Sequence, residues 1–166
     1  MEEKSCKDES CLEDFKEDYN KYKEKYNLPE FNKINQDFQI EKIAEIETDY
    51  FLREIRKFMS EKFASYLRFT ESIINPSNAP MFVFSITKTL NSEDKIKLTE
   101  VYKELAKNQV ELIERDLDYS EEKEAQFIKD SYTMWKKMEK DLLEVVQKIK
   151  SNWDNKAENN GKGYFG

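Results

Sequence analysis

Glycine does not occur in this chain before Gly161. The only three glycines, Gly161, Gly163 and Gly166, lie among the last six residues, and the chain has only three prolines. Both residue types interrupt helices, glycine because it loses most backbone freedom on ordering and proline because it lacks an N–H donor. The charge is carried mainly by Lys and Glu, which favour helices. The sequence therefore predicts an all-α fold of long helices with few tight turns.

The residue types that are missing also exclude several classes of function. Histidine is absent, which rules out a Ser-His-Asp or Cys-His relay, an HExxH zinc site and a Glu-x-x-His di-iron motif. A Walker loop or a GxGxxG turn needs internal glycine so that the backbone can approach a phosphate closely. We therefore expect no cofactor and no metal site, and the sequence favours a non-enzymatic protein over an enzyme.

Composition and charge exclude further classes of function. Aromatic residues make up 13% of the chain, which argues against wholesale disorder. The net charge of −7 disfavours a sequence-independent nucleic-acid binder, because such proteins present cationic faces to phosphates. No apolar run approaches the ~20 residues that span a bilayer, and the first ten residues contain no apolar signal-peptide core. We expect a soluble cytoplasmic protein that binds neither nucleic acid nor membrane.

The two cysteines, Cys6 and Cys11, lie four residues apart in a polar segment. A structural zinc site needs about four ligands, and a disulfide framework needs more cysteines than these. We expect free, exposed thiols. The alternative is a zinc ion or a disulfide shared between two copies of the chain.

Prolines and capping residues divide the chain into helical segments. The clearest break is the sequence Asn-Pro-Ser-Asn-Ala-Pro at 75–80. We predict a disordered tail over 1–10, a single helical domain over 11–154 and a flexible tail over 155–166. The predicted helices cover residues 11–26, 37–74, 79–90, 92–118 and 121–151.

Apolar stripes on the three long segments predict an antiparallel helical bundle. The short 79–90 helix and the N-terminal helix would pack against it. The stripe of the 92–118 helix contains Leu98, Val101, Tyr102, Leu105, Leu112 and Ile113. The last helix repeats Ile128, Trp135, Leu142 and Ile149 with a period of seven, which suggests self-assembly into a homo-oligomer as one hypothesis.

Polar residues on these apolar stripes are candidates for a buried site. Such groups need partners, or their ionisation shifts, when they are removed from water. One interpretation is a carboxylate–ammonium site for acid–base work or ligand binding. The alternative is that they lie at the rims of the interfaces. The residues are Lys62, Gln109, Asp116 and Glu139.

Three further groups are candidates for binding a protein partner. A basic strip on the 37–74 helix lies opposite its apolar stripe and should face solvent, where Arg can capture carboxylates or phosphates. The aromatic N-terminal helix covers either the chain's own core or a partner. The tail aromatics resemble a short docking peptide. The basic strip consists of Arg53, Arg56, Lys57 and Arg68. The aromatic residues of the N-terminal helix are Phe15, Tyr19 and Tyr22, and those of the tail are Tyr164 and Phe165.

These observations give three hypotheses. The first is a non-enzymatic helical scaffold or protein–protein interaction protein of the cytoplasm, with partners of unknown identity. The alternative is an enzyme or small-ligand binder that uses the Lys/Asp/Glu cluster without histidine. The second alternative is a self-assembling helical oligomer.

Overall fold

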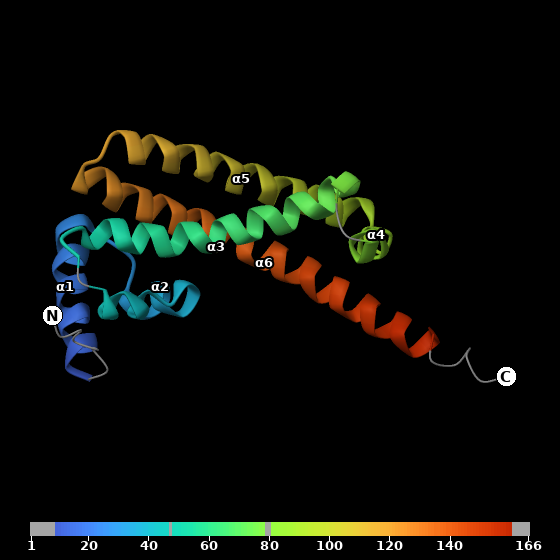
Figure 1. Cartoon of the computed structure of the whole chain (residues 1–166), viewed down its shortest axis with the longest axis horizontal. Coiled ribbons are helices and arrows are strands. Elements are labelled where there is room, and N and C mark those ends of the chain that lie inside the picture. Colours follow the sequence, from blue (N-terminus) through green and yellow to red (C-terminus); the bar gives the residue numbers. More distant parts are fainter. Residues whose placement is uncertain (1–8, 47, 79–80, 161–166) are drawn as a thin grey trace, which may run out of the picture. The chain divides into compact units, whose positions relative to one another are not determined.

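The computed structural model describes residues 9–46, 48–78 and 81–160, and every regular element within these ranges is helical (Figure 1). The all-α prediction is therefore confirmed. No helix among these residues combines the length and apolar character needed to cross a bilayer. The elements in chain order are α1 (Glu9–Tyr26), α2 (Phe31–Phe38), η1 (Ile40–Glu45), α3 (Phe51–Ile74), η2 (Pro76–Asn78), α4 (Met81–Thr87), α5 (Ser92–Leu117) and α6 (Glu121–Asn160).

The chain divides into two compact units. Unit 1 consists of residues 1–63 and 108–134, and unit 2 consists of residues 64–107 and 135–166. The three longest helices, α3, α5 and α6, contribute a segment to each unit. Unit 1 therefore holds α1, α2 and η1 together with the start of α3, the end of α5 and the start of α6.

The prediction of one continuous helix over 37–74 is wrong. Helix α2 ends at Phe38, and the next residue, Gln39, adopts a left-handed conformation with φ of 55° while its N–H donates to the Asn35 carbonyl at 2.7 Å. Ile40, Ile55 and Ile73 of the predicted apolar stripe are buried, and so are Phe38 and Ile43 on either side of the break. Tertiary burial thus bends the backbone between them, because a straight helix is not needed to bring these side chains into the core.

The start of α3 is set by local polar contacts. The backbone N–H of Tyr50 donates to the Thr48 hydroxyl at 3.0 Å, immediately before the helix begins at Phe51. A threonine side chain that bonds nearby backbone competes with helical hydrogen bonding and favours a helix boundary. The polar stretch before Phe51 therefore separates η1 from α3.

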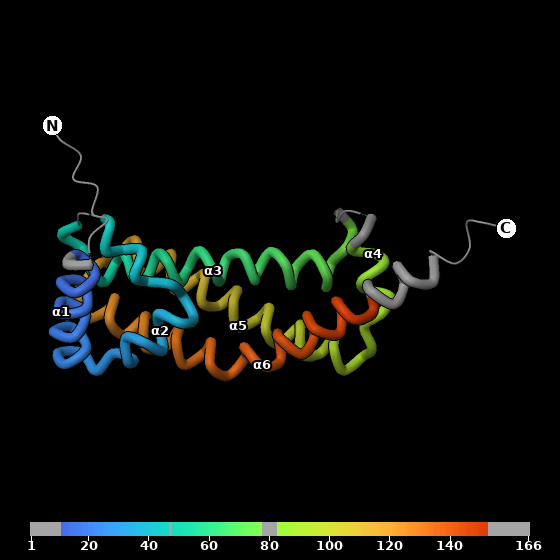
Figure 2. Tube along the Cα trace, turned by 90° about the horizontal axis from the view of Figure 1, so that it is seen from below, coloured from blue at the N-terminus to red at the C-terminus, as the bar shows by residue number. Residues whose placement is uncertain are grey.

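Aromatic packing holds α1 in unit 1. The Phe15 ring lies 5.0 Å from Phe51 and 6.0 Å from Phe31, centroid to centroid, and Tyr22 stacks on Phe51 at 5.1 Å. Tyr19 is fully buried, and its hydroxyl donates to the Pro29 carbonyl at 2.8 Å. Burial raises the pKa of Tyr19 well above its ordinary range. Figures 1 and 2 both show α1 and α2 beside the start of α3. Helix α1 thus covers the core of its own unit.

In unit 1, α5 turns back into α6 through residues 118–120. The Ser120 hydroxyl accepts from the backbone N–H of Lys123 at 3.2 Å and so caps the start of α6. Further from the turn, the Asn108 side-chain amide donates to the Ser131 hydroxyl at 2.7 Å, and both residues are buried. This buried pair connects α5 and α6 at a point further from the turn than the Ser120 cap.

In unit 2, the start of α5 is closed by a reciprocal cap. The Asn91 side chain accepts from the Asp94 N–H at 2.9 Å, and the Asp94 carboxylate accepts from the Asn91 N–H at 2.9 Å. Lys148 of α6 also donates to the Asp94 carboxylate. One turn further along α5, Lys97 pairs with Glu144 at 2.9 Å. Asn91 is therefore the N-cap of α5.

The period-seven residues of α6 have neighbours within their own units. Ile128 is buried in unit 1 and Leu142 in unit 2, while Trp135 stacks on Tyr66 with a centroid distance of 5.2 Å. Ile149 is partly buried. Self-assembly through this seam stays a prediction.

The first and last helices extend beyond their predicted bounds. Helix α1 begins at Glu9, and α6 continues to Asn160, beyond the predicted end at 151. Cys11 is disulfide-bonded, so the expectation of a free thiol is wrong for this residue. Cys6, Tyr164 and Phe165 lie outside the described residues.

The first prediction concerns the cap of α5. Replacing Asn91 by alanine removes the acceptor for the Asp94 N–H and leaves a backbone donor without its partner. We expect Asn91→Ala to lower the free energy of unfolding by about 1 kcal/mol, measured by urea denaturation. A serine at this position restores a capping oxygen, so Asn91→Ser should recover most of the loss. Equal stability of the alanine variant and the parent would contradict the cap.

The second prediction concerns pH. Burial alone raises the pKa of Asp94, but hydrogen bonds from Lys148 and the Asn91 N–H outweigh it and hold the pKa below the ordinary value of 3.8. A depressed pKa stabilises the folded state above the unfolded-state pKa, and this contribution is lost as the pH falls through the folded-state pKa. We expect Asp94→Asn to be less stable than the parent at neutral pH, with the difference shrinking below about pH 4.

Urea denaturation of both proteins across this pH range measures that difference. Glu93→Gln is the matched control, because Glu93 lies in the same turn with an exposed side chain. A stability difference for Asp94→Asn that does not change with pH would contradict the assignment.

Candidate functional site

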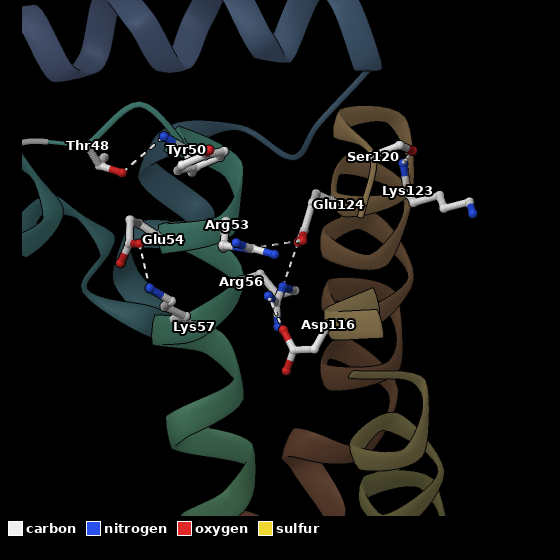
Figure 3. A network of polar contacts seen from close by, with 10 residues as sticks. All are labelled: Thr48, Tyr50, Arg53, Glu54, Arg56, Lys57, Asp116, Ser120, Lys123 and Glu124. Atoms are coloured by element: carbon white, nitrogen blue, oxygen red, sulfur yellow. Dashed lines mark hydrogen bonds and ion pairs between the residues drawn. The ribbon is translucent and has the colours of Figure 1, made fainter. Parts of the chain in front are cut away.

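A group of opposed charges lies between α3, α5 and α6 in unit 1. At its centre is Arg56, which is only 2% exposed. Its Nε donates to Glu124 Oε2 at 2.6 Å, and its Nη2 donates to Asp116 Oδ1 at 2.8 Å. Figure 3 shows Arg53 and Arg56 reaching from α3 toward Glu124, with Asp116 beside Arg56. We call Arg53, Arg56, Asp116 and Glu124 the charge cluster.

The helix positions of these residues explain why they meet. Arg56 is buried in α3 together with the preceding residue, Ile55. Glu124 lies in the first turn of α6, where the helix dipole favours an acidic side chain, and Asp116 lies in the last turn of α5. The short turn between α5 and α6 brings these two carboxylates to the same end of the hairpin. One arginine can therefore bridge both, since its planar guanidinium offers several donors.

Burial dominates the electrostatics of Glu124, which is 1% exposed. Burial raises the pKa of Glu124, and this effect outweighs the opposite influence of the Arg56 guanidinium. The second carboxylate oxygen, Oε1, lies 4.0 Å from Arg53 Nε. Neither of these two atoms has a hydrogen-bond partner among the described residues. Among the described residues, only Oε2 of the Glu124 carboxylate therefore accepts a hydrogen bond.

Arg53 also contacts two tyrosine rings. Its guanidinium carbon lies 4.7 Å from the Tyr119 ring centroid and 5.5 Å from that of Tyr50, and the two rings meet edge to face at 5.7 Å. Such stacking favours arginine over lysine, because the guanidinium is planar and weakly hydrated. Arg53 thus fixes the loop before α3 against the turn before α6.

The charge cluster is suited to holding helices together. Its two cations and two carboxylates compensate one another, and the Arg56–Glu124 contact is closed to solvent. A general acid or base must be accessible to a substrate, and the Glu124 carboxylate is closed to solvent in this arrangement. Among the described residues, no group of three or more acidic or cysteine side chains is arranged to hold a metal ion.

The predicted buried polar site does not assemble as expected. Lys62 Nζ donates to the backbone carbonyl of Asp37 at 2.5 Å and lies 6.0 Å from the Phe38 ring centroid. Glu139 pairs with Lys136 at 2.8 Å within its own helix. Gln109 is partly buried, and Asp116 belongs to the charge cluster. Lys62, Asp116 and Glu139 therefore each have a different partner.

The residues of the predicted basic strip also differ in burial and in their partners. The expectation that Arg56 faces solvent is wrong, because α5 and α6 bring two carboxylates to that side of α3. Lys57 is exposed and pairs with Glu54 at 2.7 Å, and Arg68 is exposed with a bond to the Ser65 hydroxyl at 3.3 Å. Glu124 was not predicted as a site residue, although it precedes Ile128 by one helical turn and so lies on the buried stripe of α6.

A second feature of unit 1 is an apolar face on the last part of α5. Val110, Ile113 and Leu117 are 67%, 53% and 84% exposed. Their spacing of three and four residues places them on one side of the helix. The prediction that Ile113 belongs to the buried stripe is therefore wrong, whereas Leu98, Val101 and Leu105 are buried as predicted. We call Val110, Ile113 and Leu117 the α5 stripe.

The third prediction tests the charge cluster. Glu124→Gln removes the charge that compensates Arg56 while keeping the side-chain size. Removing one partner of a buried ion pair leaves the other charge uncompensated, so we expect a loss of about 3–5 kcal/mol in the free energy of unfolding. Lys57→Gln is the control, since it breaks an exposed pair next to Arg56 and should cost about 1 kcal/mol or less.

Urea denaturation of the three proteins gives the comparison. Similar stabilities for the Glu124 and Lys57 variants would show that the buried pair does not hold these helices together.

No family model, curated protein or solved structure matches this chain. The arrangement of the chain's own residues is therefore the basis for any functional assignment.

Proposed function

We propose that this chain is a non-enzymatic helical protein of the cytoplasm that binds a basic, amphipathic helix of a partner protein through the α5 stripe. The observation that carries the proposal is the exposure of three aliphatic side chains on one side of a helix, at 67%, 53% and 84%. Apolar area gains about 25 cal/mol per Å² when it leaves water, so such a face favours a covering partner.

The spacing of the α5 stripe suits a helical partner. Residues at intervals of three and four form a continuous ridge, which is how one helix contacts another along its length. A β-strand partner would instead need unpaired backbone groups on an exposed sheet edge, and the described residues contain no strand. The partner is therefore expected to present its own apolar residues at helical spacing.

The charges around the α5 stripe favour a basic partner. Glu114 and Asp116 border it on either side, and Asp118 follows its end; all three carboxylates are exposed. Arg115 and Lys123 partly offset them through ion pairs with Glu114 and Asp118. A second copy of this chain would bring the same acidic residues to the contact, and such like-charge contacts oppose association. Lysine or arginine residues beside the partner's apolar face would instead be attracted by these carboxylates.

The charge cluster supports this function indirectly. Arg56 binds Asp116, which lies one residue before Leu117, and so restrains the last turn of α5. A binding surface that is already ordered loses less conformational entropy when the partner arrives. The cluster thus explains how an exposed apolar face stays in helical form.

We also infer that the long helices pack antiparallel within each unit. In unit 2, the order of the Asp94–Lys148 and Lys97–Glu144 pairs supports this, because later residues of α5 pair with earlier residues of α6. In unit 1, the buried Asn108–Ser131 pair and the short turn at 118–120 support the same direction.

The fourth prediction tests the α5 stripe with a synthetic peptide. The probe is an amphipathic helix with leucines on one face and lysines on its flanks. We expect it to bind the full chain with a dissociation constant on the order of 10 μM, measured by fluorescence anisotropy. Ile113→Glu places a charge in the apolar contact and should weaken binding at least about tenfold.

Two controls separate the stripe from general electrostatic attraction. Ile96→Glu adds the same charge to α5 at another exposed isoleucine, and it should leave most of the affinity intact. A peptide of equal charge with serines in place of leucines should bind weakly. Equal affinity of the parent and the Ile113 variant would refute the proposal. So would a concentration-dependent dimer, seen by light scattering, that Ile113→Glu abolishes, since the face would then bind a second copy.

A further inference from the structure

Unit 2 contains a pocket of about 340 Å³ beside the C-terminal end of α3. Its other walls come from η2, the end of α4 and the first turns of α5. The wall is apolar over Ile73, Ile74, Pro76 and Leu98, and Ile73 and Leu98 are buried. Figure 1 shows α4 next to the end of α3 and the start of α5. The pocket therefore has an aliphatic interior formed by three helical segments.

The polar groups of the pocket are cationic. Lys88 and Lys95 line it and are exposed, and neither forms an ion pair with any described residue. No acidic side chain is among the described residues that line it. The two threonines that line it use their hydroxyl protons within their own helices, Thr87 toward Phe84 at 3.0 Å and Thr99 toward Lys95 at 2.7 Å. In a chain of net charge −7, this is a local excess of two uncompensated positive charges.

We propose that this pocket binds a small amphipathic anion, namely an aliphatic chain with a single carboxylate head, as in a medium-chain fatty acid. The aliphatic wall would cover the chain, and Lys88 and Lys95 would hold the carboxylate at the opening. An apolar interior with a few converging polar groups is the usual composition of a small-molecule site.

Size and charge narrow the choice of ligand. Ligand pockets have volumes of roughly 300–1,000 Å³, so this one is at the small end and suits a medium rather than a long chain. A metal cation would be repelled by the lysines. A sugar phosphate would match the charge but would leave its hydroxyls unpaired against an apolar wall. The pocket shares no residue with the α5 stripe, so this inference does not depend on the proposed partner binding.

The fifth prediction tests this pocket by isothermal titration calorimetry on the full chain with decanoate as the probe. We expect decanoate to bind at one site with a dissociation constant below about 1 mM. Two matched probes separate the contributions of the ligand: decanol has the aliphatic chain without the charge, and acetate has the charge without the chain. Both should bind at least about tenfold more weakly than decanoate. Raised salt should weaken decanoate binding, because exposed charges are screened.

Variants of the exposed lysines test the site without disturbing the core. Lys88→Gln and Lys95→Gln should each weaken decanoate binding about fivefold, and the double variant more than tenfold. Lys103→Gln is the matched control, because Lys103 is exposed on α5 outside the pocket. Ile74→Asp, which changes an exposed part of the apolar wall, should also abolish binding. Circular dichroism of each variant checks that the helices are retained.

Three outcomes would overturn the inference. One is no decanoate binding to the folded parent at about 1 mM. Another is equal binding by the double lysine variant, which would show general adsorption of an amphiphile. The third is equal affinity for decanol and decanoate, which would leave the lysines without a role.

Discussion

Arg56 is the residue on which the arrangement of unit 1 most depends. A buried guanidinium must be paired, because desolvating an isolated charge is far more costly than any single packing contact can offset. Here the pairing partners come from two other helices, Glu124 of α6 and Asp116 of α5, at 2.6 and 2.8 Å. The requirement to satisfy one cation thus determines where the end of α5 and the start of α6 lie against α3.

The exposed face of α5 is connected to this arrangement. Leu98, Val101 and Leu105 of unit 2 are buried, whereas Val110, Ile113 and Leu117 of unit 1 are exposed. At about 100° per residue, Val110, Ile113 and Leu117 lie on a different side of α5 from Leu98, Val101 and Leu105, so the contacts that bury the second group do not cover the first. Arg56 binds the carboxylate one residue before Leu117, and this contact stabilises the last turn of α5 although its aliphatic residues gain nothing from burial. The charge cluster therefore supports the proposed partner binding by keeping an exposed apolar face ordered.

Sequence patterns predicted most of the helices but fewer of their contacts. The cap at Asn91, the ends of α1 and α5 and the burial of Leu98 and Leu105 could be predicted, because each depends on residues within a few positions of one another. The break at Gln39 could not, since the periodic apolar residues around it are compatible with one long helix. Arg56 was predicted to face solvent, because the periodicity of one helix contains no information about carboxylates on another helix.

The sequence by itself determined the all-helical class, the position of most breaks and the exclusion of histidine- and glycine-dependent chemistry. These follow from residue types and local hydrogen bonding, which do not require knowledge of the fold. Only the tertiary structure decided that Arg56 is buried, that Ile113 is exposed and that Lys88 and Lys95 meet at an aliphatic pocket. Each of these depends on which helix faces come together, and that is set by the combined burial and pairing of residues far apart in the chain.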